Sequence, residues 1–169
     1  IHAEVLVQNQ RYEQAWDAAR RALRCDERYV PALRALVKAS LAQDRKELAA
    51  SILANALSAA PNDAELHYLN AQILGRETGR AREQVAALER AVELRPSYSE
   101  ARMELGTMLL RSGNYTGALA QFEAVSRLNP TLPAVHLNLG DAYRSLRRWT
   151  EAKASYDRVV ASSPNMPEV

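Results

Sequence analysis

Four prolines recur at a nearly fixed interval along this chain, and they constrain its fold more than any other feature. Successive members of the set Pro61, Pro96, Pro130 and Pro164 are separated by the same interval to within one position, about 34 residues. The same step joins Leu105 to Leu139, Gly106 to Gly140, Tyr115 to Trp149, Ala118 to Ala152 and Phe122 to Tyr156. A period of this length is typical of stacked repeats, in which each unit buries its apolar face against its neighbours.

The period continues into the first half of the chain. Ala22 precedes Ala56 by one period, whereas Ala56 precedes Ala91 by one position more than a period. We therefore predict one extra residue in the connection between Gly75 and Glu83.

Each period contains two predicted amphipathic helices. Leu105, Met108 and Leu109 have the spacing of one helix face, and Ser-Gly-Asn at 112–114 separates this helix from the next. Pro130 ends the second helix, because proline disfavours a helical conformation in the residue before it. The pattern predicts no strand and ten helices, near residues 1–9, 12–25, 30–42, 46–59, 64–75, 81–94, 99–112, 115–128, 133–146 and 149–162.

Two of these helix starts have the spacing of a capping box. Asn62 is followed by Glu65, and Ser97 is followed by Glu100, each three residues on. In such a box the two side chains accept hydrogen bonds from each other's backbone N–H groups. We expect these boxes to fix the starts of the helices near residues 64 and 99.

The pattern resembles the tetratricopeptide repeat family, whose 34-residue unit has small residues in both helices, an aromatic residue in the second and a closing proline. Gly106, Ala118, Phe122 and Pro130 match this unit, as do the residues one period further on. Earlier units depart from it at Val37 and Gln84, where a small residue is usual, and at Glu27, where proline belongs.

The resemblance implies an all-α fold, a right-handed α-solenoid of stacked antiparallel helix hairpins. We expect a single domain over residues 1–169, with a partial repeat at 1–29 and full repeats at 30–63, 64–98, 99–132 and 133–166. We also expect the chain to be a fragment of a longer protein.

Packing explains the residue types of the repeat. Gly106 is expected where the first helix crosses the second, because a side chain there would hold the two helices apart. Ala118 is expected to receive this contact, Phe122 to fill the wedge between the helices and Tyr115 to cover the turn. The residues one period on are expected to do the same in the next repeat.

Composition excludes several classes of function. The 22 basic and 20 acidic side chains are spread along the whole length and give a net charge of only +2, which argues against nucleic acid as a partner. Cys25 is the single cysteine, so no intrachain disulfide can form. No apolar run approaches the roughly 18 residues of a membrane-spanning helix, so no transmembrane segment is expected.

No catalytic or cofactor motif stands out. Residues 75–80 have the wrong spacing and ending for a phosphate-binding loop. His67 and His136 lie two repeats apart, too far to share a metal ion, and we interpret them as partly buried packing residues. Glu65 and Glu100 are one repeat apart with no evident pocket to separate their pKa values. We therefore expect no enzyme activity, no cofactor and no metal site in this chain.

The resemblance also implies that the first helices of the repeats line a concave groove. Arginines at near-equivalent positions there could bind carboxylates, while apolar residues beside them receive side chains of a peptide. The alternative is a solvated arginine face without recognition. The candidate groove residues are Arg34, Lys38, Glu65, Tyr68, Gln72, Arg76, Glu100, Met103, Thr107, Arg111, Leu137, Asp141 and Arg144.

Two groove chemistries known in the family do not fit this sequence. The carboxylate clamp would need an asparagine where Leu69 stands and a cation where Glu104 stands. The asparagine ladder resembling that of O-linked GlcNAc transferase would need asparagine at Ala35, Leu69 and Glu104, and only Asn138 fits.

We therefore predict a non-enzymatic scaffold that binds a protein or peptide segment in the groove, within a larger bacterial assembly. The alternative is a substrate-recruiting domain of a larger enzyme such as a glycosyltransferase. The compartment, bacterial cytoplasm or periplasm and cell envelope, stays open. The last helix is expected to leave an apolar strip uncovered at Tyr156, Val159 and Val160, which would favour self-association through this helix or continuation into further repeats.

Overall fold

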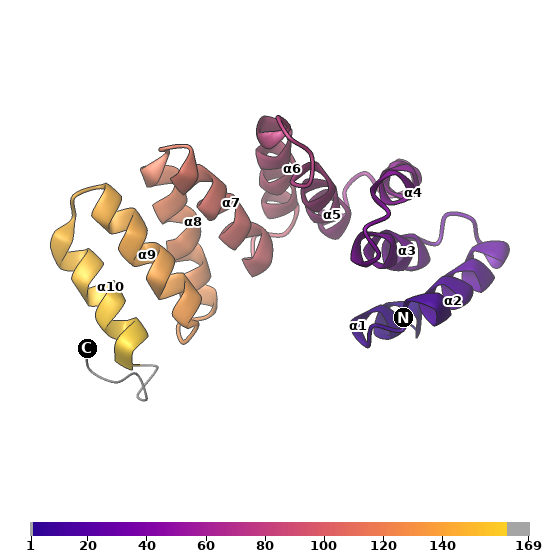
Figure 1. Cartoon of the computed structure of the whole chain (residues 1–169), viewed down its shortest axis with the longest axis horizontal. Coiled ribbons are helices and arrows are strands. Elements are labelled where there is room, and N and C mark those ends of the chain that lie inside the picture. Colours follow the sequence, from indigo (N-terminus) through magenta and orange to yellow (C-terminus); the bar gives the residue numbers. More distant parts are fainter. Residues whose placement is uncertain (1, 162–169) are drawn as a thin grey trace. The chain divides into compact units, whose positions relative to one another are not determined.

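The computed structural model describes residues 2–161 and contains ten helices and no strand in that range. The helices are α1 (His2–Gln8), α2 (Tyr12–Cys25), α3 (Val30–Ala42), α4 (Lys46–Ala59), α5 (Ala64–Leu74), α6 (Ala81–Leu94), α7 (Ser99–Arg111), α8 (Tyr115–Leu128), α9 (Pro133–Ser145) and α10 (Trp149–Ala161). Figure 1 shows them in sequence order. Their bounds lie within one residue of those predicted, which confirms the all-helical repeat pattern. The predicted final residue of the last helix, 162, and Pro164 lie outside the described residues.

The helices form two compact units (Figure 1). Unit 1 comprises residues 1–95 with α1 to α6, and unit 2 comprises residues 96–169 with α7 to α10. Within each unit consecutive helices pack as hairpins, and the first helix of a hairpin also contacts the first helix of the next, as α3 does with α5 and α7 with α9. Stacked hairpins are the arrangement that the solenoid fold class predicts. The single-domain organisation stays a prediction.

In unit 2 each hairpin closes through a glycine placed against an aromatic ring. A Cβ atom added to Gly106 would lie 2.5 Å from the Phe122 ring, and one added to Gly140 would lie 2.3 Å from the Tyr156 ring. The glycine therefore faces the ring of the aromatic residue, which reaches across the hairpin. The predicted contact with Ala118 stays a prediction.

Unit 1 fills the same positions with a different combination of sizes. Val37 and Ala71 stand where unit 2 has glycine, and Leu53 and Leu88 stand where it has an aromatic residue. All four are buried, and Val37 shares a core cluster with Leu53. A larger residue in the first helix is thus matched by a smaller one in the second, which keeps the hairpin close-packed. This explains how the repeat tolerates Val37.

Every hairpin turn contains one residue in the left-handed backbone region. These residues are Gln10, Asp44, Gly79, Gly113 and Arg147, with φ between 56° and 86°, and each follows the previous one by a repeat period or one position more. The turn around Gly79 is the longest, because α5 ends at Leu74 and α6 begins only at Ala81. The predicted extra residue therefore lies in this connection.

The predicted capping boxes do not form. The N-cap residue of α5 is Asp63, whose carboxylate accepts hydrogen bonds from the N–H groups of Glu65 and Leu66 over 2.9 and 3.2 Å. The N-cap residue of α7 is Tyr98, which makes no side-chain cap hydrogen bond. Both N-caps lie one residue after the predicted ones, so the spacing that suggested Asn62 and Ser97 was coincidental.

A second contact recurs at the closing prolines. His67, Arg102 and His136 each donate a side-chain N–H to the carbonyl of the proline six residues earlier, over 2.8, 2.6 and 2.7 Å respectively. His136 is buried and His67 is half-buried, as predicted for packing residues. The end of the first repeat lacks this pair of residues, because Glu27 stands at the position of the proline and Leu33 at the position of the donor. The histidines thus help to hold the connection between successive hairpins.

The last helix is only partly exposed along its predicted apolar strip. Val160 is 65% exposed, whereas Tyr156 and Val159 are half-buried, and the Tyr156 hydroxyl donates to Asp141 over 2.8 Å. Trp149, which was expected to cover the turn, is 63% exposed, so that expectation is wrong. Self-association through this helix stays a prediction.

Candidate partner-binding surfaces

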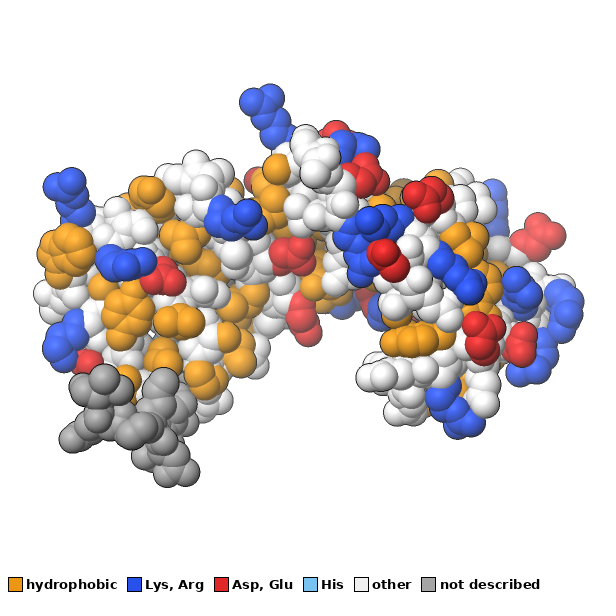
Figure 2. Space-filling view, in the orientation of Figure 1, with side chains coloured by type: hydrophobic (Ala, Val, Ile, Leu, Met, Phe, Trp, Pro, Cys, Tyr) orange, Lys and Arg blue, Asp and Glu red, His pale blue; other side chains and the backbone are white. Residues whose placement is uncertain are grey.

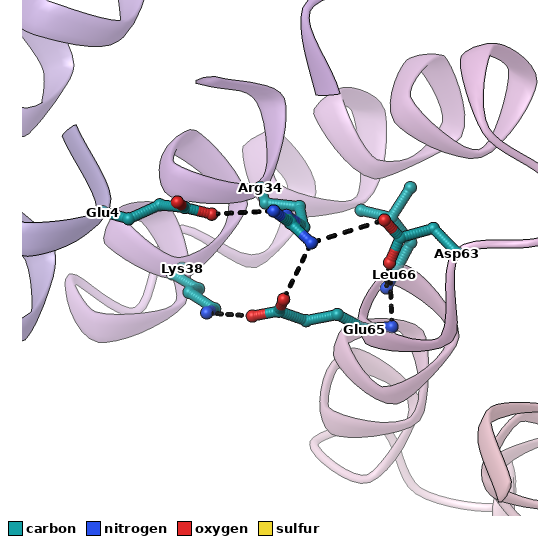
Figure 3. Close-up of polar contacts among 6 residues, drawn as sticks. All are labelled: Glu4, Arg34, Lys38, Asp63, Glu65 and Leu66. Atoms are coloured by element: carbon teal, nitrogen blue, oxygen red, sulfur yellow. Dashed lines mark hydrogen bonds and ion pairs between the residues drawn. The ribbon is translucent and has the colours of Figure 1, made fainter. Parts of the chain in front are cut away.

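In unit 1 the predicted groove cations are held by carboxylates of the same chain (Figure 3). Arg34 on α3 contacts Glu4 on α1 over 3.1 Å, Asp63 over 3.4 Å and Glu65 on α5 over 2.9 Å. Lys38, one turn further along α3, also pairs with Glu65. We call these five residues the Arg34 cluster. It joins the first helices of three successive hairpins.

Burial explains why Arg34 has so many partners. Its side chain is only 19% exposed, and a charge withdrawn from water is costly unless it is paired and hydrogen-bonded. The cluster contains three carboxylates and two cations, so it carries no surplus positive charge. Its arrangement therefore suits stabilisation of the stack better than capture of a carboxylate from a partner.

Arg76 also has partners within unit 1. Its guanidinium donates to the carbonyl of Leu41 over 3.0 Å and to the Asp44 carboxylate over 3.1 Å. These bonds tie Arg76, two residues after α5, to the end of α3 and to the turn that follows α3. The two remaining groove candidates of this unit, Tyr68 and Gln72, are half-buried on α5.

Unit 2 has an open pocket where unit 1 has its charge cluster. The pocket has a volume of about 740 Å³ and lies between the first half of α7 and the segment that leads into α9. Asn129 donates to the Ser99 hydroxyl over 3.0 Å, which holds the two walls together. The pocket is lined by Ser99, Glu100, Met103, Glu104, Thr107, Asn129, Thr131, Leu132 and Pro133.

The pocket combines an apolar wall with an acidic edge. Met103, Leu132 and Pro133 supply apolar surface, while Glu100 and Glu104 lie one helical turn apart on α7. Leu137, one turn beyond Pro133 on α9, is 48% exposed. Figure 2 shows hydrophobic side chains gathered over α7 and α9.

The other end of these two helices is basic. Arg111 is exposed in the last turn of α7, and Arg144 is exposed in the last turn of α9, where it pairs with Asp141 over 3.2 Å. Asp141 also accepts the hydrogen bond from Tyr156, and burial, followed by this bond, raises the pKa of the Tyr156 phenol. Arg144 corresponds to Leu110 and not to Arg111 in the repeat register, so the predicted arginine ladder is irregular.

A smaller pocket of about 320 Å³ lies beside α8 and α10 in unit 2. Tyr143 donates its hydroxyl to Glu123 over 3.1 Å, and the Arg148 guanidinium lies 4.6 Å from the centre of the Tyr143 ring. Burial, followed by the bond to Glu123, raises the pKa of the Tyr143 phenol. Both carboxylates of this pocket already have partners, because Glu123 accepts the bond from Tyr143 and Glu151 pairs with Arg148 over 2.8 Å.

Among residues 2–161 no group of three or more histidine, cysteine, aspartate or glutamate side chains could hold a metal ion. In the same range no helix is long and apolar enough to cross a membrane.

Sequence reasoning found part of each surface and missed the rest. It selected Arg34, Lys38 and Glu65 but not Glu4 or Asp63. The one available signal for Asp63 is that Tyr29, Tyr98 and Leu132 occupy the same repeat position, which makes Asp63 its single acidic member. The segment 129–133 was missed because its place beside α7 depends on how two hairpins stack.

Comparison with known proteins agrees with this architecture. A sequence profile described as "Tetratricopeptide repeat" matches residues 76–133 and 109–167, which together span 92 of the 169 residues. A search of curated proteins finds no match.

Solved structures are similar over nearly the whole chain. A crystal structure of MamA is 19% identical with a TM-score of 0.78, covering 96% of this chain and 94% of that one. PilF of Pseudomonas aeruginosa is 26% identical with a TM-score of 0.82, covering 95% and 73%. YrrB, described as a TPR protein with an unusual peptide-binding site, is 24% identical with a TM-score of 0.74, covering 96% and 84%.

Proposed function

Because this chain belongs to the tetratricopeptide repeat family, we propose that it is a non-enzymatic scaffold. It binds a segment of a partner protein along the first helices of unit 2, as one module of a larger bacterial assembly. The observation that carries this proposal is the open pocket beside Met103, which stands where unit 1 is closed by its own ion pairs.

Several features of the surface support the proposal. An exposed apolar area next to polar groups is typical of recognition sites, and Leu137 extends the apolar wall of the pocket along α9. YrrB, whose structure is similar, is described as having an unusual peptide-binding site, which supports the same class of ligand for this chain. An extended segment could place apolar side chains against Met103 and Leu137.

The arginines give this surface a second type of contact. No ion pair to Arg111 is formed within the described part of the chain, and Arg144 has only the exposed Asp141 pair. Guanidinium groups bind carboxylates through two parallel hydrogen bonds when the geometry allows. A carboxylate of the partner near the ends of α7 and α9 would then add to the apolar contacts.

The test compares Arg111→Glu with the matched charge reversal Arg158→Glu on α10. The partner is first identified by crosslinking to the chain, and its affinity for each variant is then measured by calorimetry. If Arg111 is desolvated by the partner, its reversal should weaken binding by roughly 2 to 5 kcal/mol, whereas Arg158→Glu should cost well under that. Equal losses, or no loss from either, would contradict binding along the first helices.

A further inference from the structure

We propose that the pocket of unit 2 selects a segment in which a large apolar side chain stands next to a lysine or arginine. The apolar side chain enters between Met103 and Leu132, and the cation pairs with Glu100 at the edge. This inference rests on the proposed function and names the chemistry of the partner.

The lining of the pocket carries the first part of the argument. It contains two carboxylates and no cation, so its net charge is negative. The amide dipoles at the start of α7 offset part of that charge, since the N-terminal end of a helix is partly positive. A volume of about 740 Å³ falls within the usual range of ligand pockets, roughly 300 to 1,000 Å³, and accommodates a large side chain.

The repeat register carries the second part. Glu100 is one period after Glu65, and in unit 1 the Glu65 carboxylate is held by Arg34 and Lys38. One period after those two cations the chain has Tyr68 and Gln72, neither of which is charged.

Glu100 therefore lacks the built-in cations that its counterpart has. It is exposed, and none of the described residues of unit 2 forms an ion pair with it. The chain itself thus shows that a glutamate at this repeat position accepts a cation, and a lysine or arginine of the partner takes the place of Arg34 and Lys38.

The experiment uses two short synthetic peptides with one leucine each as probes. In the basic probe the leucine is flanked by lysines, and in the acidic probe it is flanked by glutamates. Each is titrated into the ¹⁵N-labelled chain, and amide shifts in the NMR spectrum report both affinity and location. The basic probe should shift the amides of residues 99–107, 129, 131 and 132, and the acidic probe should bind about tenfold more weakly, equivalent to ~1.4 kcal/mol.

Two pairs of variants sharpen the result. Glu100→Gln should weaken binding of the basic probe about two- to fivefold, as expected for an exposed ion pair, while Asp157→Asn on α10 should not. Thr107→Phe should block the pocket. Thr116, which is exposed at the start of α8, supplies the control, and Thr116→Phe should leave binding unchanged.

Other outcomes overturn the inference in distinguishable ways. A basic partner would be excluded if the acidic probe bound equally well or if the shifts lay outside the pocket. It would also be excluded if the basic probe caused no shifts at about 5 mM, a concentration well above a Kd of 1 mM. Shifts of the pocket residues on concentrating the chain alone would identify a second copy as the occupant. Binding along the first helices is tested separately, by the comparison of Arg111→Glu with Arg158→Glu on the crosslinked partner.

Discussion

One repeat position on the first helices carries different chemistry along the chain. In unit 1 it is Arg34, which is 19% exposed and contacts three carboxylates, and, one period on, the half-buried Tyr68. In unit 2 it is Met103, which lines the open pocket, and Leu137, which is 48% exposed. One scaffold thus uses the position for internal cohesion in one unit and leaves it available to a partner in the other.

The hairpin cores differ in the same orderly way. Unit 1 pairs Val37 with Leu53 across the hairpin, whereas unit 2 sets Gly106 against Phe122. Because the summed size of the two side chains is roughly the same in both units, the helices remain close-packed in each. The fold therefore tolerates changes of residue size, provided that they are compensated within one hairpin.

The largest effect is expected from removing the centre of the charge cluster. Arg34→Met copies unit 2 into unit 1 and leaves Glu4, Asp63 and Glu65 without their shared cation. Because these groups are partly exposed, the loss should be smaller than for a fully buried ion pair. The substitution should lower the free energy of unfolding by about 2 to 4 kcal/mol. Urea denaturation followed by circular dichroism measures this loss.

The reverse change is the control for that experiment. Met103→Arg places a cation beside the open pocket and should change stability by less than about 0.5 kcal/mol, as surface substitutions usually do. If the two substitutions cost the same, the Arg34 cluster does not stabilise unit 1 and the contrast between the units is lost.

The next effect concerns the compensated cores. Gly106→Val should destabilise the chain by about 1 to 3 kcal/mol, since its Cβ atom alone would lie 2.5 Å from the Phe122 ring. Phe122→Leu should also destabilise, because it leaves a cavity. The double variant recreates the Val37 and Leu53 combination of unit 1.

A double-mutant cycle on thermal unfolding tests the compensation. The double variant should be more stable than the sum of the single changes by about 1 kcal/mol or more, as expected for residues in direct contact. Additive losses would mean that the two substitutions do not compensate each other, and that the hairpins of the two units are not packed in equivalent ways.

The repeat register made the helices predictable, and lateral packing made the surfaces unpredictable. Helix bounds follow from local signals, such as Pro130 and the turn at 112–114, and these agree with the structure. The Arg34 cluster required knowing that Glu4, on the first helix of the preceding hairpin, and Asp63, at the start of the following one, reach the same guanidinium. Nothing in the spacing of charges within one helix indicates such a contact.

The smallest effect compares two turns of unit 2. Arg147 has φ 59° in the turn between α9 and α10, where Gly113 has φ 86° in the turn between α7 and α8. A side chain in this backbone region costs roughly 1 to 2 kcal/mol of stability. Glycine removes this cost, but its greater conformational freedom in the unfolded state offsets part of the gain. Arg147→Gly should therefore stabilise by about 0.5 kcal/mol, because Arg147 is exposed and its side chain forms no ion pair with the described residues.

Gly113→Arg is the matched exchange and should have the opposite sign. A Cβ atom added to Gly113 meets no atom within 4 Å, so any loss of stability comes from the backbone conformation alone. The difference in melting temperature between the two variants, measured by calorimetry, should be about 3 to 8 °C if they differ by roughly 1.5 to 2 kcal/mol. A loss from both changes would show that the Arg147 side chain stabilises its turn, and the two turns would then not be equivalent.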